Sequence, residues 1–159
     1  MNVLGIDPGL GNTGYGIISI QNNNFSVVDF GVIKTTTKDK LSDRLKIIFN
    51  GTNHLIKKYK PSIFSIEEIF YSKNVKSSLL LGHARGVAIA AASTNELLVY
   101  EYSARKIKQS LTGNGNAHKD QVRFMVKNML KMSTEPTSSD ASDALGIALC
   151  YALQTKLEY

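Results

Sequence analysis

The sequence predicts an α/β domain in which helices flank a mixed five-stranded sheet. Three apolar, strand-like segments follow one another within the first 34 residues, and strand-like and helical segments then alternate. The chain has 159 residues, of which 43% are hydrophobic and 20% charged. One domain over residues 1–159, with a sizeable core, is therefore expected.

The first three strands are expected at residues 2–7, 13–20 and 25–34. Pro8-Gly9 ends the first strand, and the polar run QNNN (21–24) joins the second to the third. Because parallel neighbours need a long crossover connection, these three strands are predicted to be antiparallel.

A helix is expected over 41–59, where apolar residues recur at steps of three and four before Pro61. The run SIFSIEEIF (62–70) predicts a fourth strand, and LLVYEY (97–102) predicts a fifth, with a helix rich in Ala and Gly over about 75–94 between them. These crossovers place the fourth and fifth strands parallel to the first. Three further helices are expected at about 103–111, 118–132 and 140–156.

Charge and cysteine content narrow the class of protein. Nineteen Lys and Arg against thirteen Asp and Glu give a net charge of +6, which favours a polyanionic partner such as nucleic acid. The single cysteine, Cys150, excludes an internal disulfide and a cysteine-based zinc cluster, and it suits a reducing cytoplasm. No apolar run reaches bilayer length, and the N-terminus opens straight into a strand. We therefore expect a cytoplasmic protein without a membrane partner.

Acidic residues interrupt segments that otherwise have the pattern of buried structure. Asp7 ends the first strand, and Glu67 and Glu68 interrupt the fourth, where the pleat sends them to opposite faces. Asp140 and Asp143 open the last helix three residues apart, so they project from the same side of its first turn. If the first and fourth strands are neighbours, Asp7 and one glutamate meet, and a helix packed on the sheet can add the other two acids.

Each acid also has a purely structural interpretation. Asp140 suits a helix N-cap, with Asp143 favoured by the helix dipole, and Asp7 suits a turn acceptor. The combination, with no histidine or cysteine near it in sequence, favours instead an oxygen-ligand site for Mg²⁺ or Mn²⁺. Two such ions about 4 Å apart can activate water and stabilise the leaving oxygen of a phosphodiester. A basic protein with this cluster is a candidate nuclease.

Five blocks of sequence resemble one known family in their order and spacing. They are GIDPGLGNTGYG (5–16), FSIEEIF (64–70), LGHARGVA (81–88), YSARKIKQSLTGNGNAHKDQV (102–122) and SSDASDAL (138–145). Together they resemble the RuvC family of bacterial Holliday junction resolvases, of the RNase H-like superfamily, over nearly the whole chain. The resemblance implies an RNase H-like fold and a cytoplasmic homodimer that grips four-way DNA junctions in recombination and repair. It also implies paired symmetrical nicks in strands of like polarity, Mg²⁺ or Mn²⁺ with two ions per active site, and a branch-migration helicase complex as partner.

The resemblance assigns the catalytic, metal-binding carboxylates to Asp7, Glu67, Asp140 and Asp143, and it places Glu68 at a variable position. Lys108 and Lys119 match two lysines near the active site, where a lysine can bind the scissile phosphate or stabilise developing charge. From the sequence pattern alone, both would be solvated helix-face charges.

An aromatic residue that touches junction bases in the family matches Phe70, and Tyr71 can share that role. Spacing alone equally suits Phe70 as the last core residue of its strand. Basic residues near these blocks are expected to bind DNA phosphates; they are Lys73, Lys76, Arg85, Arg105, Lys106, Lys108, Lys119 and Arg123. The small residues of 82–92 allow close helix approach, either inside the domain or in the dimer contact that the family makes there.

Other function classes fit parts of the sequence. The first block is similar to the phosphate-binding hairpin of the actin, Hsp70 and sugar-kinase group, but that group is built from two such domains and no second hairpin of this kind occurs. A DNA-binding module that no longer cuts, or a related RNase H-like nuclease acting on RNA, would keep the fold. The four acids, the block at 81–88 and the basic stretch 102–123 favour the junction resolvase.

Overall fold

The five strands form one sheet in the order β3-β2-β1-β4-β5. The computed structural model describes residues 1–69 and 73–156. β1 (Asn2–Asp7) is central and antiparallel to β2 (Asn12–Gln21), which is antiparallel to β3 (Asn24–Lys34). On the other side of β1, β4 (Ile63–Glu67) and then β5 (Leu98–Tyr102) run parallel to it. The mixed sheet predicted from segment spacing is confirmed.

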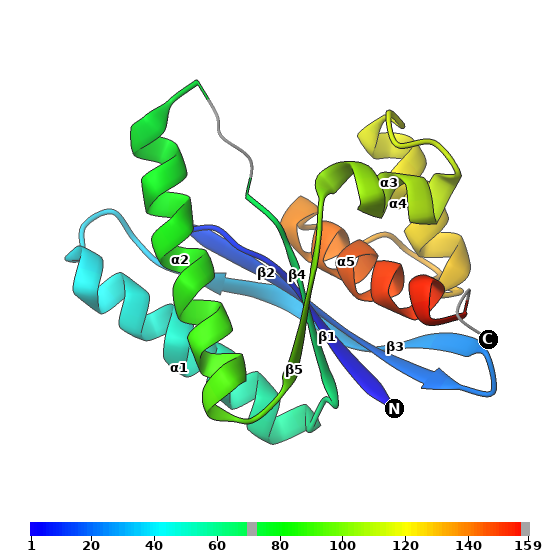
Figure 1. The fold of residues 1–159 in the computed structure, drawn as a ribbon, viewed down its shortest axis with the longest axis horizontal. Helices are drawn as coiled ribbons and strands as arrows, with labels where there is room; N and C mark the ends of the chain where they lie inside the picture. The colour runs from blue at the N-terminus through cyan, green and yellow to red at the C-terminus, as the bar shows by residue number, and fades with distance from the viewer. Residues whose placement is uncertain (70–72, 157–159) are drawn as a thin grey trace.

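Helices cover both faces of this sheet (Figure 1). α1 (Leu41–Tyr59) and α2 (Val75–Thr94) lie together on one face. On the other face lie α3 (Ala104–Thr112), α4 (Lys119–Met129) and α5 (Ser139–Lys156). Within residues 1–69 and 73–156, no helix combines the length and hydropathy needed to cross a membrane.

The strand pleat divides the core into two clusters, because alternate side chains point to opposite faces. The cluster under α1 and α2 contains Leu4, Ile6, Phe64 and Ile66. Val3 and Ile63 belong to the other cluster, which packs against α3, α4 and α5. The same alternation places the side chains of Asp7 and Glu67 on the α5 face, at the ends of two neighbouring strands.

α5 is apolar on nearly all sides because it lies between the sheet and the pair formed by α3 and α4. Glycines on the strands let its backbone come close. A Cβ atom added at Gly5 would lie 2.2 Å from the Ala144 carbonyl oxygen, and one at Gly16 would lie 2.7 Å from the Leu145 backbone nitrogen. No side chain fits at either position, so backbone contact sets the position of α5 on the sheet.

Two elements are shorter than predicted. β4 ends at Glu67 rather than near residue 70, because the β1 pairing stops at Ile66 and the β5 pairing stops at Glu67. α4 ends at Met129 rather than near 132, because Lys131 has φ 52°, a left-handed conformation that a helix does not continue through. Every element begins within one residue of its predicted start.

Candidate active site

The four predicted acids line one pocket of about 350 Å³ on the α5 face of the sheet. Asp7 and Glu67 come from strand ends, and Asp140 and Asp143 come from the first turn of α5. The remaining lining residues come from α3, α4 and α5, and they are Ala104, Ile107, Lys108, Lys119, Val122, Ser139 and Ile147. The structure therefore brings together acids that are up to 136 positions apart in the sequence, Asp7 and Asp143.

The pleat selects Glu67 rather than Glu68 for this pocket. Ser65, two residues before Glu67 and on the same face, donates its hydroxyl to the Ile147 carbonyl of α5 at 3.0 Å. Glu68 is exposed, and its charge acts on Arg85 of α2, on the opposite face of the sheet. Sequence periodicity leaves open which of the two glutamates faces the pocket. Glu67 faces it because α5 covers that side of β4.

Asp140 reaches the pocket because the start of α5 packs directly on β2. A Cβ atom added at Gly14 would lie 2.1 Å from the Asp140 carbonyl oxygen, and Gly14 is the register partner of Asp7. The helix is capped by Ser138, whose hydroxyl accepts from the Ala141 N–H at 3.4 Å. The N-cap interpretation of Asp140 is therefore wrong, since this acid lies within the first turn of α5.

The turn after β1 is closed without the Asp7 carboxylate. The Thr13 hydroxyl donates to the Gly9 carbonyl at 2.7 Å, and the Thr35 N–H donates to the Gly11 carbonyl at 2.9 Å. Among residues 1–69 and 73–156, no hydrogen bond reaches the Asp7 carboxylate. The turn-acceptor interpretation of Asp7 is not supported.

Burial and mutual repulsion raise the pKa values of three acids in the pocket, Asp7, Glu67 and Asp143. Burial is the largest cause that raises the pKa of Asp7 to about 8, followed by the charges of Asp143, Glu67 and Asp140. The pKa values of Glu67 and Asp143 are raised by the same two causes, burial first. Lys119 opposes the shift in all three acids. The pocket holds more negative charge than its own lysines neutralise.

This donor set suits a divalent cation. Among the described residues, the anionic groups that line the pocket are four carboxylates, and the lining contains neither histidine nor cysteine. Carboxylate oxygens are ligands that Mg²⁺ and Mn²⁺ prefer. In the described part of the chain, no three His, Cys, Asp or Glu side chains already lie close enough together to hold a metal ion. A bound cation would offset the negative charge of these carboxylates.

Lys119 occupies an unfavourable position for helix stability. It is the first residue of α4, where the helix dipole disfavours a positive charge. From there it acts electrostatically on three of the acids, whereas Lys108, on α3, acts on Glu67. Arg123, one turn further along α4, acts on Asp143, and its Nε is buried without a hydrogen-bond partner in the described part of the chain.

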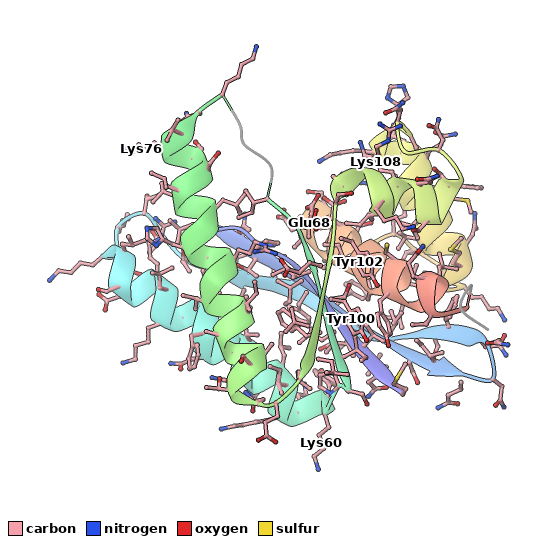
Figure 2. The ribbon with its side chains drawn as sticks, viewed as in Figure 1. Lys60, Glu68, Lys76, Tyr100, Tyr102 and Lys108 are labelled. Carbon is pink, nitrogen blue, oxygen red and sulfur yellow. The ribbon has the colours of Figure 1, made fainter. Side chains whose placement is uncertain are left out.

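The other predicted DNA contacts lie outside the pocket lining. Arg105 and Lys106 are exposed on α3, and Lys73 and Lys76 are exposed just before and within the start of α2. Figure 2 shows Lys76 and Lys108 on opposite sides of the end of β4, where Glu68 lies. Phe70 and Tyr71 fall outside the described residues.

Arg85 differs from these exposed cations. Its Nε donates to the Glu67 carbonyl at 2.9 Å, and its guanidinium forms an ion pair with Glu101 of β5. This contact was not evident from the sequence, where Arg85 resembles any basic residue on a helix. The role of Gly14 beneath Asp140 was not evident either, although glycines at two alternate positions of one strand, Gly14 and Gly16, indicate a face without side chains.

Comparisons with known proteins identify the family. The family model described as "Crossover junction endodeoxyribonuclease RuvC" matches residues 3–151. A curated protein of that name from Vibrio vulnificus is 47% identical over 154 residues, 97% of this chain and 88% of the relative. Its counterpart from Ruminiclostridium cellulolyticum is 44% identical over 151 residues, 95% of this chain and 91% of the relative.

Solved structures agree. Thermus thermophilus RuvC has a TM-score of 0.92 at 28% identity, covering 99% of this chain and 97% of that one. The same protein in complex with Holliday junction substrate has a TM-score of 0.94 at 29% identity, covering 99% of this chain and 96% of that one. The fold is the predicted RNase H-like one, and the chain belongs to the RuvC family of crossover junction endodeoxyribonucleases.

Proposed function

We propose that this chain resolves four-way DNA junctions in recombination and repair by hydrolysing phosphodiester bonds. The observation that carries the proposal is the meeting of Asp7, Glu67, Asp140 and Asp143 in one pocket that Lys108 and Lys119 also line. Family membership supplies the substrate class, since a relative was solved in complex with Holliday junction substrate. A net charge of +6 suits a DNA partner.

The four acids would hold the catalytic metal, Mg²⁺ with Mn²⁺ as a substitute, as two ions per active site. When bound, such ions supply a nucleophilic water and offset charge on the scissile phosphate. The protein's own contribution is a set of partly buried carboxylates that line one pocket, and burial together with their mutual repulsion raises the pKa of three of them. Because carboxylates bind metal when ionised, binding of a metal here would release protons from this pocket.

Lys119 and Lys108 are proposed to act on the phosphate. Lys119 lines the same pocket and offsets the charge of Asp7, Glu67 and Asp143, so we expect its ammonium group to meet a phosphate that reaches the acids. An ammonium group there can donate to a non-bridging phosphate oxygen, on which charge develops in the transition state. Lys108 acts on Glu67 from the α3 wall and would serve the same phosphate.

The DNA arms are proposed to pass over both sides of the end of β4. Lys76 of α2 and Lys108 of α3 lie on opposite sides of this point (Figure 2). Further exposed cations are Arg105 and Lys106 on α3 and Lys73 just before α2. Such residues bind phosphates and position the duplex without reading its sequence. Arg123 extends the surface along α4, and Phe70 and Tyr71 would contact junction bases by stacking.

A homodimer formed through α2 would present two pockets to one junction. The outer side of α2 exposes Val75 (69%) and Leu79 (63%), and a Cβ added at Gly82 or Gly86 meets no atom within 4 Å. An exposed apolar helix side of this kind favours contact with a second copy. Two pockets are what paired nicks in strands of like polarity require. A branch-migration helicase would dock on the junction-bound dimer, a part of the proposal that rests on the family.

The test is a synthetic mobile four-way junction incubated with the protein and Mg²⁺, followed by mapping of the nicks on all four strands. We expect symmetrically placed nicks on two strands of like polarity, none in a linear duplex of the same sequence, and no cutting in EDTA. Equal cutting of the linear duplex, or unpaired nicks on strands of opposite polarity, would contradict the proposal.

A further inference from the structure

Arg85 contacts the backbone of Glu67 from behind the sheet. Its side chain is 17% exposed, its Nε donates to the Glu67 carbonyl oxygen at 2.9 Å, and its guanidinium pairs with Glu101. Burial lowers the pKa of Arg85, and the charge of Glu68 acts in the opposite direction. The guanidinium therefore already contacts one carbonyl and one carboxylate of the protein itself, and it also feels the charge of Glu68.

The guanidinium and the acidic pocket lie on opposite faces of the sheet. Glu101 is the register partner of Ile66, and Ile66 belongs to the core under α1 and α2. Glu101 therefore points to the α2 face, from which Arg85 approaches. The Glu67 side chain, one residue after Ile66, points to the α5 face and lines the pocket.

The contact falls where the strand pairing of β4 ends. The β1 pairing stops at Ile66, so Glu67 has no partner on β1. On the other side, the Glu68 N–H donates to the Tyr102 carbonyl at 2.9 Å. A charge-assisted hydrogen bond from Arg85 is stronger than one between neutral groups, and it holds the last residue of β4 from the α2 side.

We propose that Arg85 is a positioning residue for Glu67, which holds the end of β4 so that the Glu67 carboxylate is presented to the divalent cation. This inference rests on the proposed function in one respect, the assignment of Glu67 as a metal ligand. It replaces the expectation that Arg85 binds DNA phosphate. A phosphate approaching the guanidinium would meet the carboxylates of Glu101 and Glu68, both of which interact with Arg85.

The test compares Arg85→Gln with Lys57→Gln, which removes the same charge from an exposed position on α1. Mn²⁺ binding to the free protein is measured by titration calorimetry, and junction binding is measured separately in EDTA. For Arg85→Gln we expect Mn²⁺ affinity to fall about tenfold or more, as it does when residues that orient metal ligands are changed, with junction affinity within about threefold of wild type. Lys57→Gln should leave both quantities at the wild-type value.

Arg85→Lys keeps the positive charge but loses the planar guanidinium group. It is expected to weaken Mn²⁺ binding less than Arg85→Gln does. If Arg85→Gln lacks a cooperative thermal transition, Arg85→Lys carries the test, and wild-type Mn²⁺ affinity in that variant overturns the proposal. A loss of junction binding with unchanged Mn²⁺ affinity also overturns it, in favour of a DNA contact. Because the Mn²⁺ titration uses no DNA, a wild-type protein that failed to cut junctions would refute the proposed function without deciding the role of Arg85.

Discussion

The two faces of the sheet hold their helices in different ways. Under α1 and α2 the space is filled by large side chains, namely Leu4, Ile6, Ile17, Phe64 and Ile66. Under α5 the corresponding strands carry Gly5, Gly14 and Gly16, and the helix backbone lies against the strands. One face is a side-chain core, and the other is partly a backbone contact.

This difference explains why the acids gather on one face only. A helix that lies close to the strands brings its first turn, with Asp140 and Asp143, to the ends of β1 and β4. Large side chains at the glycine positions would hold the same helix away from the strand ends. Burying acids together opposes folding, and the apolar cores on both faces of the sheet offset that cost.

The largest effect is expected from Asp7→Asn, which keeps the shape of the side chain and removes the charge that would hold the metal. Cleavage of a four-way junction should fall roughly a thousandfold in a single-turnover assay. Junction binding in EDTA should stay near the wild-type value, because the change lies within the pocket. A variant that nicks junctions at the wild-type rate would remove Asp7 from the site.

A smaller loss is expected from Lys119→Ala. Without the ammonium group, cleavage should slow by roughly 10²-fold while junction affinity changes much less, because one phosphate contact is a small part of a large interface. Comparing single-turnover rates with binding isotherms separates the two effects. If affinity falls as much as rate does, Lys119 is a phosphate contact only.

Gly14→Ala and Ile17→Val compare the two faces directly on one strand. An added methyl group at Gly14 would push against the Asp140 backbone, so stability should fall by about 1–3 kcal/mol and Mn²⁺ affinity should fall with it. Ile17→Val removes a methyl group from the other face, which should cost about 0.5–1.5 kcal/mol and leave Mn²⁺ affinity unchanged. Denaturant unfolding and Mn²⁺ titration of both variants provide the measurements. Equal Mn²⁺ affinities in the two variants would show that the backbone contact at Gly14 does not position Asp140.

The smallest effect is a pH dependence of stability in the metal-free protein. The pKa of Asp7 is raised from 3.8 to about 8, so its contribution to stability is fully present below pH 3.8 and is lost as the pH rises through 8. The melting temperature without metal should therefore fall by several degrees, on the order of 5 °C, between pH 6 and pH 8.5. Saturating Mg²⁺ should reverse the fall, and Asp7→Asn should flatten it. A metal-free profile that rises over this range would contradict the assigned shift.

The sequence pattern predicts the sheet because short connections force antiparallel pairing and helical crossovers force parallel pairing. It also predicts that Asp140 and Asp143 share a side, since helical spacing is local. It does not say which face α5 covers, so it leaves open whether Glu67 or Glu68 faces the helix. The family resemblance favours Glu67, and the packing of α5 on that face of β4 agrees. The end of β4 depends on where its strand partners stop, and the end of α4 depends on the left-handed conformation of Lys131. Hydrophobic periodicity reveals neither feature.

The contact made by Arg85 could not be predicted from the sequence. In the sequence it is one cation among several around the β4–α2 connection, and charge alone favours a phosphate contact. Its hydrogen bond to the Glu67 carbonyl depends on α2 lying across the sheet, which is a tertiary feature. Exposed neighbours such as Lys76 have no such contact with the Glu67 backbone among the described residues.

The adjacent glutamates of β4 provide the most direct test of the two-face arrangement. Glu67→Gln and Glu68→Gln make the same chemical change one residue apart, on opposite faces of the sheet. Single-turnover cleavage of a four-way junction in Mg²⁺ should be lost in Glu67→Gln, to the same extent as in Asp7→Asn, and should stay within about threefold of wild type in Glu68→Gln. Loss of cleavage in Glu68→Gln with retained cleavage in Glu67→Gln would show that the metal is held on the other face.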